Sequence, residues 1–335
     1  MTRACITWLA ALCVSACSSA PDRSASGEQD LWEQQGTALQ GVQLQGAPIQ
    51  GMTLVGFQFA GATLNGAALS NVHIEKGELV ADQNQVTLRG TDLESAHLIA
   101  QLRDGSVNPP ATVLVEYRIA DIAAESGYDP TSSGHTYLYT LEQNVNNTEP
   151  WATACPADID GKHVAIPTTG IWDSHANRVE SSTLFTFGCT SGAVGKCYRW
   201  GYRPWLTGYG DMAATHWACT RMARADYCGD GSSHTHDGTE VNVWDNLPSP
   251  GPIQAHGSTP LLMLFEAGWD TSGAVCMSHA RWLLDGPLIA LGCPGRLIAP
   301  GLGILNATVC DTIAQVLGQA ADATIYNEAY ITNLF

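Results

Sequence analysis

The sequence predicts a mainly β protein of the α+β class, and three observations support this. Glycine recurs every five residues near the N-terminus, together with one large apolar residue in each repeat. Runs of β-branched and aromatic residues at 113–119 and 136–141 are typical of strands. Eight of the 11 cysteines follow residue 150 and would staple a domain there. We therefore expect a short β-helix-like repeat followed by a disulfide-stapled, β-rich domain with about two helices.

Residues 1–16 have the pattern of a bacterial lipoprotein signal peptide. Arg3 gives a positive start, an apolar run covers 4–16, and the sequence VSAC at 14–17 has the small residues of a lipobox. A transmembrane helix is the alternative, but the run is shorter than the roughly 17 residues that the shortest spans need. We predict that Cys17 is lipidated and holds the protein in the cell envelope, in the outer membrane, facing the periplasm or the exterior.

The composition limits the partners. Hydrophobic residues make up 45% of the chain and charged residues 14%, which is typical of a folded protein rather than a disordered one. The formal net charge of -17 opposes binding to nucleic acid, which we exclude as a partner. We expect contact with the membrane only through the lipid on Cys17. Residues 17–35 are rich in Ser, Asp, Glu and Gln and are predicted to be a polar tether.

The segment 36–94 is predicted to be a repeat region. Its glycines run from Gly36 to Gly66 in steps of five, together with apolar residues from Leu39 to Leu79. This period fits neither a helix nor a straight strand, so the chain must turn once per repeat. The pattern resembles the pentapeptide-repeat β-helix, although its usual Asp or Asn is mostly Gln, Thr, Ala or Pro here. A glycine-rich spacer is the alternative.

Strands are expected in the region 95–150, with a further strand at 182–187 that leads into a glycine-rich, loop-rich stretch. Asp211 is a candidate N-cap for a helix over residues 212–224. An apolar face predicts a second helix over residues 306–319.

Residues 151–335 are predicted to form the disulfide-rich domain. After removal of the signal peptide, an even number of cysteines would remain in an oxidising compartment, which favours four disulfides and leaves their pairing open. Cys219 and Cys228 cannot pair with each other if the helix persists between them, because it would hold them about 13 Å apart. The predicted disulfide cysteines are Cys155, Cys189, Cys197, Cys219, Cys228, Cys276, Cys293 and Cys310.

Several motifs stand in order within this domain. They include GKC at 195–197, WGYRPW at 200–205, HWACTRM at 216–222 and FEAGW at 265–269. With the segment ADYCGDG at 225–231, they make residues 150–285 similar to the ADYC domain family. The resemblance implies little about chemistry, because it brings no established activity with it.

A set of histidines and carboxylates provides the first candidate for chemistry. Asp226 and Glu266 are candidate acid and base residues, assisted by His216 or His234, and their convergence in a cleft would indicate a hydrolase. The alternative, which we favour, is that these carboxylates form structural ion pairs or cap loops. We expect no cofactor and no metal. A metal site would have to use His234, His236 and Asp237.

Aromatic and basic residues provide the second candidate. Trp200, Arg203 and Trp205 are candidate ligand-binding residues, because exposed indoles can stack on sugars or peptides, although most tryptophans are expected in the core. Five basic residues between 196 and 224 form either an anion-binding patch or internal ion pairs, and we favour ion pairs. A cysteine nucleophile is disfavoured by the even cysteine count.

The favoured function is a non-enzymatic module that binds an envelope or extracellular polymer, peptide or protein. An extracytoplasmic hydrolase, metal-assisted or not, is the alternative.

Overall fold

The computed structural model describes residues 42, 44–46, 52–125, 136–144, 150–248, 250–293 and 310–330. The predicted signal peptide, the predicted lipidation site Cys17 and the predicted tether lie outside these residues. Strands dominate the described part of the chain, which confirms the mainly β class. No helix in the described part is long and apolar enough to cross a membrane.

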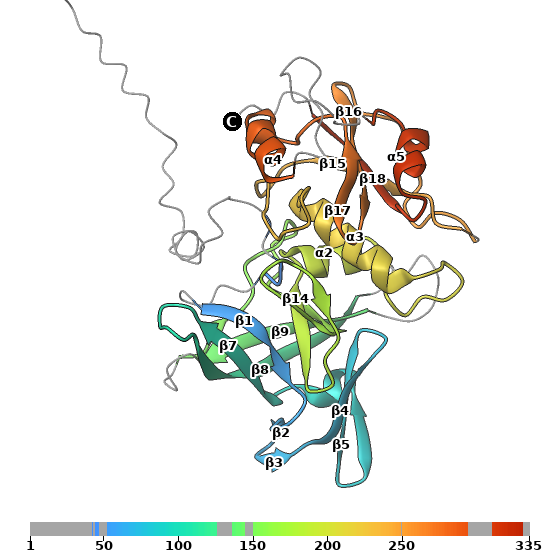
Figure 1. Ribbon diagram of the computed structural model, residues 1–335. Coiled ribbons are helices and arrows are strands. Elements are labelled where there is room, and N and C mark those ends of the chain that lie inside the picture. Colours follow the sequence, from blue (N-terminus) through green and yellow to red (C-terminus); the bar gives the residue numbers. More distant parts are fainter. Residues whose placement is uncertain are drawn as a thin grey trace, which may run out of the picture.

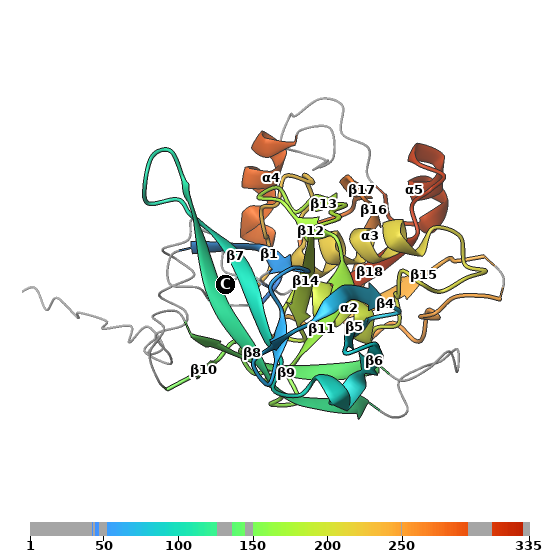
Figure 2. The same ribbon diagram turned by 90° about the horizontal axis from the view of Figure 1, so that it is seen from below.

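The largest sheet closes into a barrel, because β1 pairs with both β14 and β7. Strands follow the order β1-β14-β11-β9-β8-β7 around the barrel, and β2, β3 and β10 extend its edges. Figure 2 shows β7 and β8 on one side and β11 and β14 on the other. The barrel therefore takes strands from both sides of residue 150. The bounds are β1 (Met52–Gln58), β2 (Thr63–Leu64), β3 (Ala67–Ala68), β7 (His97–Asp104), β8 (Ala111–Glu125), β9 (Thr136–Asn144), β10 (Ala152–Thr153), β11 (Ala165–Thr169) and β14 (Leu184–Cys189).

The barrel is filled by alternating side chains. On β7, Leu98, Ala100 and Leu102 are buried while their neighbours are not, which is the period of a strand with one face in the core. Phe57 belongs to the barrel core, and the centre of its ring lies 5.0 Å from the ring centres of both Tyr117 and Phe187. These edge-to-face contacts are the favoured arrangement of aromatic rings in a packed core.

The β-helix expected for residues 36–94 is not confirmed. The described part of this segment forms β1, the short β2–β3 hairpin and a three-stranded antiparallel sheet of β4 (Ser70–Glu75), β5 (Glu78–Gln83) and β6 (Val86–Arg89). Gly66 of the repeat adopts positive φ in the two-residue turn between β2 and β3, whereas Gly56 lies within β1. The period of five therefore does not mark a turn in every repeat, although repeat residues such as Leu54 and Leu79 are buried in the barrel core.

The C-terminal half adds a four-stranded sheet and four α-helices within the described residues, two more helices than expected. Figure 1 shows α2 and α3 between the barrel and this sheet. Two short elements, η1 (Gly90–Leu93) and η2 (Leu283–Asp285), are 3₁₀ turns. The remaining bounds are β12 (Ile171–Trp172), β13 (Arg178–Val179), β15 (Val241–Asp245), β16 (Met263–Asp270), β17 (Gly273–Met277), β18 (Ile325–Tyr330), α2 (Ala193–Arg199), α3 (Met212–Arg224), α4 (Gly286–Gly292) and α5 (Ile313–Gln319).

The helix predictions were accurate for α3 and partial elsewhere. Asp211 caps α3 by accepting a hydrogen bond from the Ala214 amide at 3.0 Å, as predicted. The second predicted helix ends at Gln319 but begins at Ile313, and residues 306–309 lie outside the described residues. Helix α2 replaces part of the expected loop-rich stretch. Its Gly195 lies so close to the Cys189 carbonyl that an added Cβ would be 2.3 Å from that oxygen.

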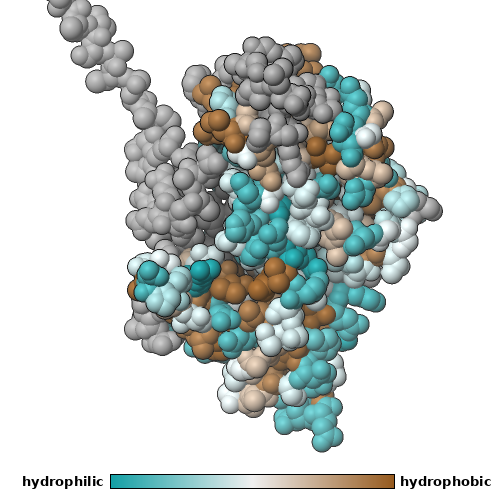
Figure 3. Space-filling model, in the orientation of Figure 1, coloured by the Kyte–Doolittle hydropathy of each residue, from teal (hydrophilic) through white to brown (hydrophobic). Residues whose placement is uncertain are grey.

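The region of α4 exposes apolar side chains on the surface of the protein (Figure 3). Leu284, Leu288 and Leu291 are 60%, 53% and 80% exposed.

All eight predicted cysteines form disulfides. The pairs are Cys155–Cys189, Cys197–Cys219, Cys228–Cys293 and Cys276–Cys310. Cys219 and Cys228 have different partners, as predicted from their separation along the helix. Four disulfides indicate a domain that folds in an oxidising, extracytoplasmic compartment.

Candidate functional site

A cavity of about 590 Å³ lies beside α2. One wall is the loop 156–160, and the opposite wall is the loop 235–241. Helix α2 contributes Lys196 and Arg199, followed by Trp200, and the floor includes Ala223 and Arg281. This volume lies in the range of pockets that hold small molecules.

The 156–160 loop is held in place by Asp158. One carboxylate oxygen accepts the backbone amides of Asp160 and Lys162, each at 2.9 Å. The other accepts the Thr190 hydroxyl at 2.7 Å and the Arg199 guanidinium at 3.0 Å. Burial opposes ionisation of Asp158, but these hydrogen bonds and the charge of Arg199 outweigh it and lower the pKa. Arg199 is thus committed to this loop, which confirms an internal ion pair for one member of the basic group.

The 235–241 loop is held by two side chains from the segment after β17. Arg281 donates to the Thr235 hydroxyl at 3.3 Å, and the Trp282 indole N–H donates to the Thr239 hydroxyl at 3.3 Å. The Trp282 ring also lies edge-on to His236, with centroids 4.3 Å apart. Both cavity walls are therefore fixed by specific hydrogen bonds, and the shape of the cavity is built into the fold.

The cavity floor rests on a buried network around Glu266. Arg281 forms a two-point ion pair with this carboxylate, with both N–O distances 3.0 Å. The Tyr227 hydroxyl and the Asn327 amide also donate to it, at 2.9 and 2.7 Å. Burial raises the pKa of Tyr227, so its hydroxyl stays a neutral donor. Glu266 therefore has no free lone pair to act as an acid or base, and its role is to position Arg281.

Lys196 differs from the other basic residues of the site. Among the described residues its side chain forms no hydrogen bond or ion pair, although it is partly buried and lines the cavity. Burial lowers the pKa of Lys196, and the charges of Asp237 and Asp158 oppose this effect. The nearby Ser191 hydroxyl also lines the cavity and is buried without a hydrogen-bond partner in the described part of the chain. The cavity thus holds two unused polar groups.

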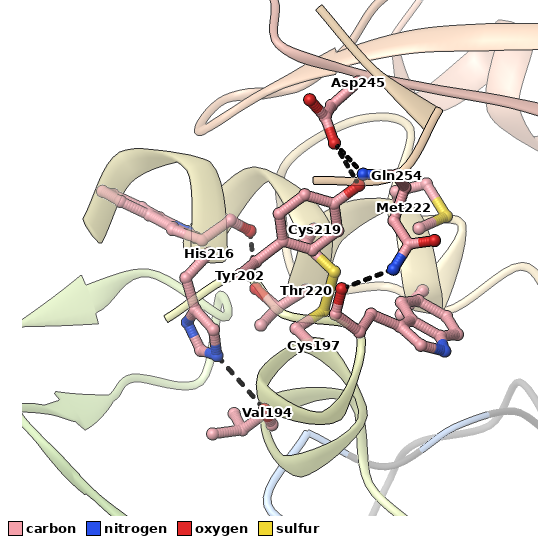
Figure 4. The surroundings of a disulfide bond; sticks show 12 residues. Val194, Cys197, Tyr202, His216, Cys219, Thr220, Met222, Asp245 and Gln254 are labelled. Atoms are coloured by element: carbon pink, nitrogen blue, oxygen red, sulfur yellow. Dashed lines mark hydrogen bonds between the residues drawn. A yellow bond between two sulfur atoms is a disulfide. The ribbon is translucent and has the colours of Figure 1, made fainter. Parts of the chain in front are cut away.

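The four residues expected to catalyse hydrolysis do not line the cavity. His216 is fully buried near the Cys197–Cys219 disulfide (Figure 4), and its Nε2 donates to the Val194 carbonyl at 3.1 Å. Burial lowers the pKa of His216 to about 3, so the ring is neutral.

The other three expected catalytic residues have separate structural roles. Asp226 pairs with Arg221 and accepts the amides of Asp230 and Gly231 at 3.1 and 3.0 Å. His234 is buried with its Nδ1 3.8 Å from Asp285, and Glu266 belongs to the floor network. Asp226 therefore joins a structural ion pair and a loop, which is the alternative that we favoured.

The three candidate ligand-binding residues do not meet in one site. Trp200 lines the cavity, whereas Arg203 is buried and Trp205 packs against Gly77 and the Tyr198 ring. His236 and Asp237 from the candidate metal set also line the cavity. In the described part of the chain, however, no group of three or more His, Cys, Asp or Glu residues could hold a metal ion.

The site residues that the sequence did not reveal as such are Lys196, Ser191, Asp158 and Glu240. The sequence places Lys196 with four arginines in one basic group, and its lack of a partner among the described residues distinguishes it from them. Arg221 pairs with Asp226, and Arg224 donates to the carbonyls of Val42 and Gly231 at 2.7 and 2.6 Å.

Residues 90–283 match the family model of the ADYC domain. This match covers more than half of the 335 residues. The chain belongs to the ADYC domain family. No curated protein and no solved structure is significantly similar to it. Every lining residue of the cavity except Val42 falls within the ADYC domain, which begins at η1 and so also includes barrel strands.

The motif of the ADYC domain at 225–228 has a structural role. Ala225 ends α3 in the left-handed conformation with φ 50°. Asp226 binds Arg221, Tyr227 donates to Glu266, and Cys228 is bonded to Cys293. The motif thus joins the end of α3 to the floor of the cavity, and its residues support the site without lining it.

Proposed function

We propose that the ADYC domain is the binding module of an exported protein and that its ligand occupies the cavity beside α2. The observation that carries this proposal is Lys196, a partly buried cation that lines an open cavity without a direct partner in the described residues. A ligand anion could give this ammonium group charge-assisted hydrogen bonds, which are stronger than those between neutral groups. Trp200 adds an aromatic surface at the same place.

The proposal includes anchoring of the protein by a lipid on Cys17 at the outer membrane, facing the periplasm or the exterior. A tether of the predicted length would allow the domain to reach polymers, peptides or proteins of the envelope. A cavity of about 590 Å³ holds a chain end or a small fragment rather than a whole polymer. We therefore propose that the ligand is a terminus or a short fragment.

The hydrolase alternative receives no support from the geometry. Asp226, Glu266 and His216 form separate structural hydrogen bonds, the His234 ring lies 3.8 Å from Asp285, and none of the four residues lines the cavity. A binding module needs no such convergence.

The test is to block the mouth of the cavity. Ala157 is exposed and lines the cavity, so Ala157→Trp would fill the opening without disturbing the core. Ala152→Trp is the matched control, because Ala152 is also exposed but does not line the cavity. Short peptides, oligosaccharides and soluble peptidoglycan fragments would be screened by ligand-observed NMR, with product analysis in the same samples.

We expect at least one class to bind the unmodified protein and Ala152→Trp but not Ala157→Trp, without turnover. No binding in any class, or equal binding to Ala157→Trp, would overturn the proposal. Turnover that Ala157→Trp abolishes would replace it with the hydrolase.

A further inference from the structure

We infer that the cavity binds a small zwitterion, the carboxylate end of an amino acid or short peptide, with Lys196 holding the carboxylate and the ammonium group facing Asp237 and Glu240. This inference rests on the proposed binding function and adds the chemical class of the ligand. It follows from the charges and hydrogen-bonding groups that the cavity leaves unused.

Two of the three basic residues that line the cavity are held in ion pairs. Arg199 is bound to Asp158 and also to Asp160 at 2.8 Å, and Arg281 is bound to Glu266. Arg199 also contacts Glu125 at 3.3 Å, so both arginines are engaged by carboxylates of the protein itself. The remaining charged groups are the ammonium of Lys196 and the carboxylates of Asp237 and Glu240.

Two donor groups that line the cavity have no hydrogen-bond acceptor among the described residues. An ammonium group offers three N–H donors, and Lys196 uses none of them in the described part of the chain. The Ser191 hydroxyl is also buried without a partner there. A carboxylate could accept from both groups, and hydrogen bonds between charged groups are shorter and stronger than neutral ones. The lowered pKa of Lys196 agrees with a cation that burial disfavours until an anion arrives.

The rim of the cavity has the opposite charge. Asp237 and Glu240 are exposed, and their side chains form no hydrogen bond or ion pair with the described residues. They would attract an ammonium group and repel a ligand with several negative charges, as would the overall charge of -17. A ligand with one carboxylate and one ammonium group complements Lys196 on the one hand and Asp237 and Glu240 on the other. Trp200 and Val241 offer apolar contact for its side chains.

The first experiment uses the lysines of the protein as reporters. The chain has only Lys76, Lys162 and Lys196, so acylation of each amine can be followed by mass spectrometry. The probe is the dipeptide alanyl-alanine, and the matched probe is alanyl-alanine amide, which lacks the carboxylate. We expect the dipeptide to slow acylation of Lys196 by about fivefold or more, while Lys76 and Lys162 react at unchanged rates. Equal protection by the amide, or no protection of Lys196 at saturating dipeptide, would overturn the inference.

The second experiment compares Lys196→Met with Lys162→Met. Methionine keeps most of the length of the lysine chain, and removing an unpaired buried charge should not destabilise the fold. Lys162 is an exposed lysine that does not line the cavity. By calorimetric titration with alanyl-alanine, we expect Lys196→Met to weaken binding about tenfold or more and Lys162→Met to leave it unchanged. Unchanged binding to a folded Lys196→Met protein would contradict the role of Lys196.

The results also separate the inference from the proposed function. If an oligosaccharide binds and Ala157→Trp blocks it, while alanyl-alanine does not bind, the ligand class is wrong and the binding function stands. If Ala157→Trp has no effect on any probe, both are wrong.

Discussion

We predict that acid destabilises this protein through His216. The ring is fully buried against the Tyr198 and Trp172 rings, with centroid distances of 4.5 and 6.0 Å, and Arg178 adds a positive charge that also disfavours protonation. Nε2 donates to Val194, and Nδ1 has no partner in the described residues. The folded protein therefore keeps this ring neutral, with its pKa lowered from 6.5 to about 3.

The magnitude follows from the difference in proton uptake. As pH falls below 6.5, the unfolded chain binds a proton at His216 and the folded chain does not, so stability is lost as the pH falls from 6.5 toward 3. Between pH 7 and pH 5 this amounts to about 2 kcal/mol, an order-of-magnitude value from 1.36 kcal/mol per pKa unit. Urea unfolding of the oxidised protein at the two pH values measures this loss through the transition midpoint.

A variant isolates this contribution from other titrating groups. His216→Gln keeps an N–H donor for Val194 and cannot take up a proton, so it should be less stable at pH 7 but should lose about 2 kcal/mol less than the unmodified protein on acidification. The pKa of His279 is also lowered by burial, but that contribution is the same in both proteins and cancels. His175→Gln, at an exposed position, should leave the pH dependence unchanged. If the unmodified protein and His216→Gln lose the same free energy between pH 7 and pH 5, the argument from burial is refuted.

Three further predictions concern the framework of the site. Replacing Cys197 and Cys219 with alanine removes a disulfide whose cysteines are 22 residues apart in the sequence. The free energy of unfolding, measured with urea, should fall by about 3 kcal/mol. A loss below about 1 kcal/mol would show that packing holds α2 on α3 without the disulfide. Asp211→Ala removes the N-cap of α3 and should cost about 1 kcal/mol in the same assay, whereas no change would mean that the cap is redundant. Gly195→Ala should destabilise by about 2 kcal/mol or more, because its Cβ would be 2.3 Å from the Cys189 carbonyl oxygen. Gly105→Ala, with nothing within 4 Å, should be close to neutral, and equal effects of the two substitutions would contradict the close approach at α2.

Local signals predicted the elements that depend on local physics. A capping residue directly precedes α3, and the apolar residues of α3 recur at helical spacing, so its bounds could be predicted from the sequence. The strands near 113 and 136 were found because β-branched and aromatic residues favour a pleated surface. Helix α2 was missed because two glycines disfavour a helix locally, and it forms because Gly195 allows close packing on Cys189.

The β-helix predicted for the repeat region is not confirmed. The five-residue spacing predicted a turn in each repeat, but Gly56 lies within β1, and short antiparallel hairpins can bury apolar residues as a β-helix would. The deciding signal was Asn65-Gly66, with φ values of 52° and 76°, a pair that favours a two-residue hairpin turn. Lys76-Gly77 has the same backbone conformation between β4 and β5. Chain reversal at these turns forms antiparallel ladders, which cannot stack as the successive coils of a β-helix.

The cavity could not be predicted from the sequence because its walls come from segments about 80 residues apart. Their approach depends on ion pairs whose partners the sequence leaves open. From the sequence alone, either Arg199 or Lys196 could have formed the ion pair, and the position of Asp158 in the 156–160 loop decides that Arg199 forms it.

Ion pairing also explains why the candidate catalytic carboxylates have structural roles. Asp226 and Glu266 are fully buried, and each is paired with an arginine that neutralises its charge, so these two acids have little freedom to react. Lys196 forms no ion pair with the described residues, so its ammonium group is available to bind a ligand.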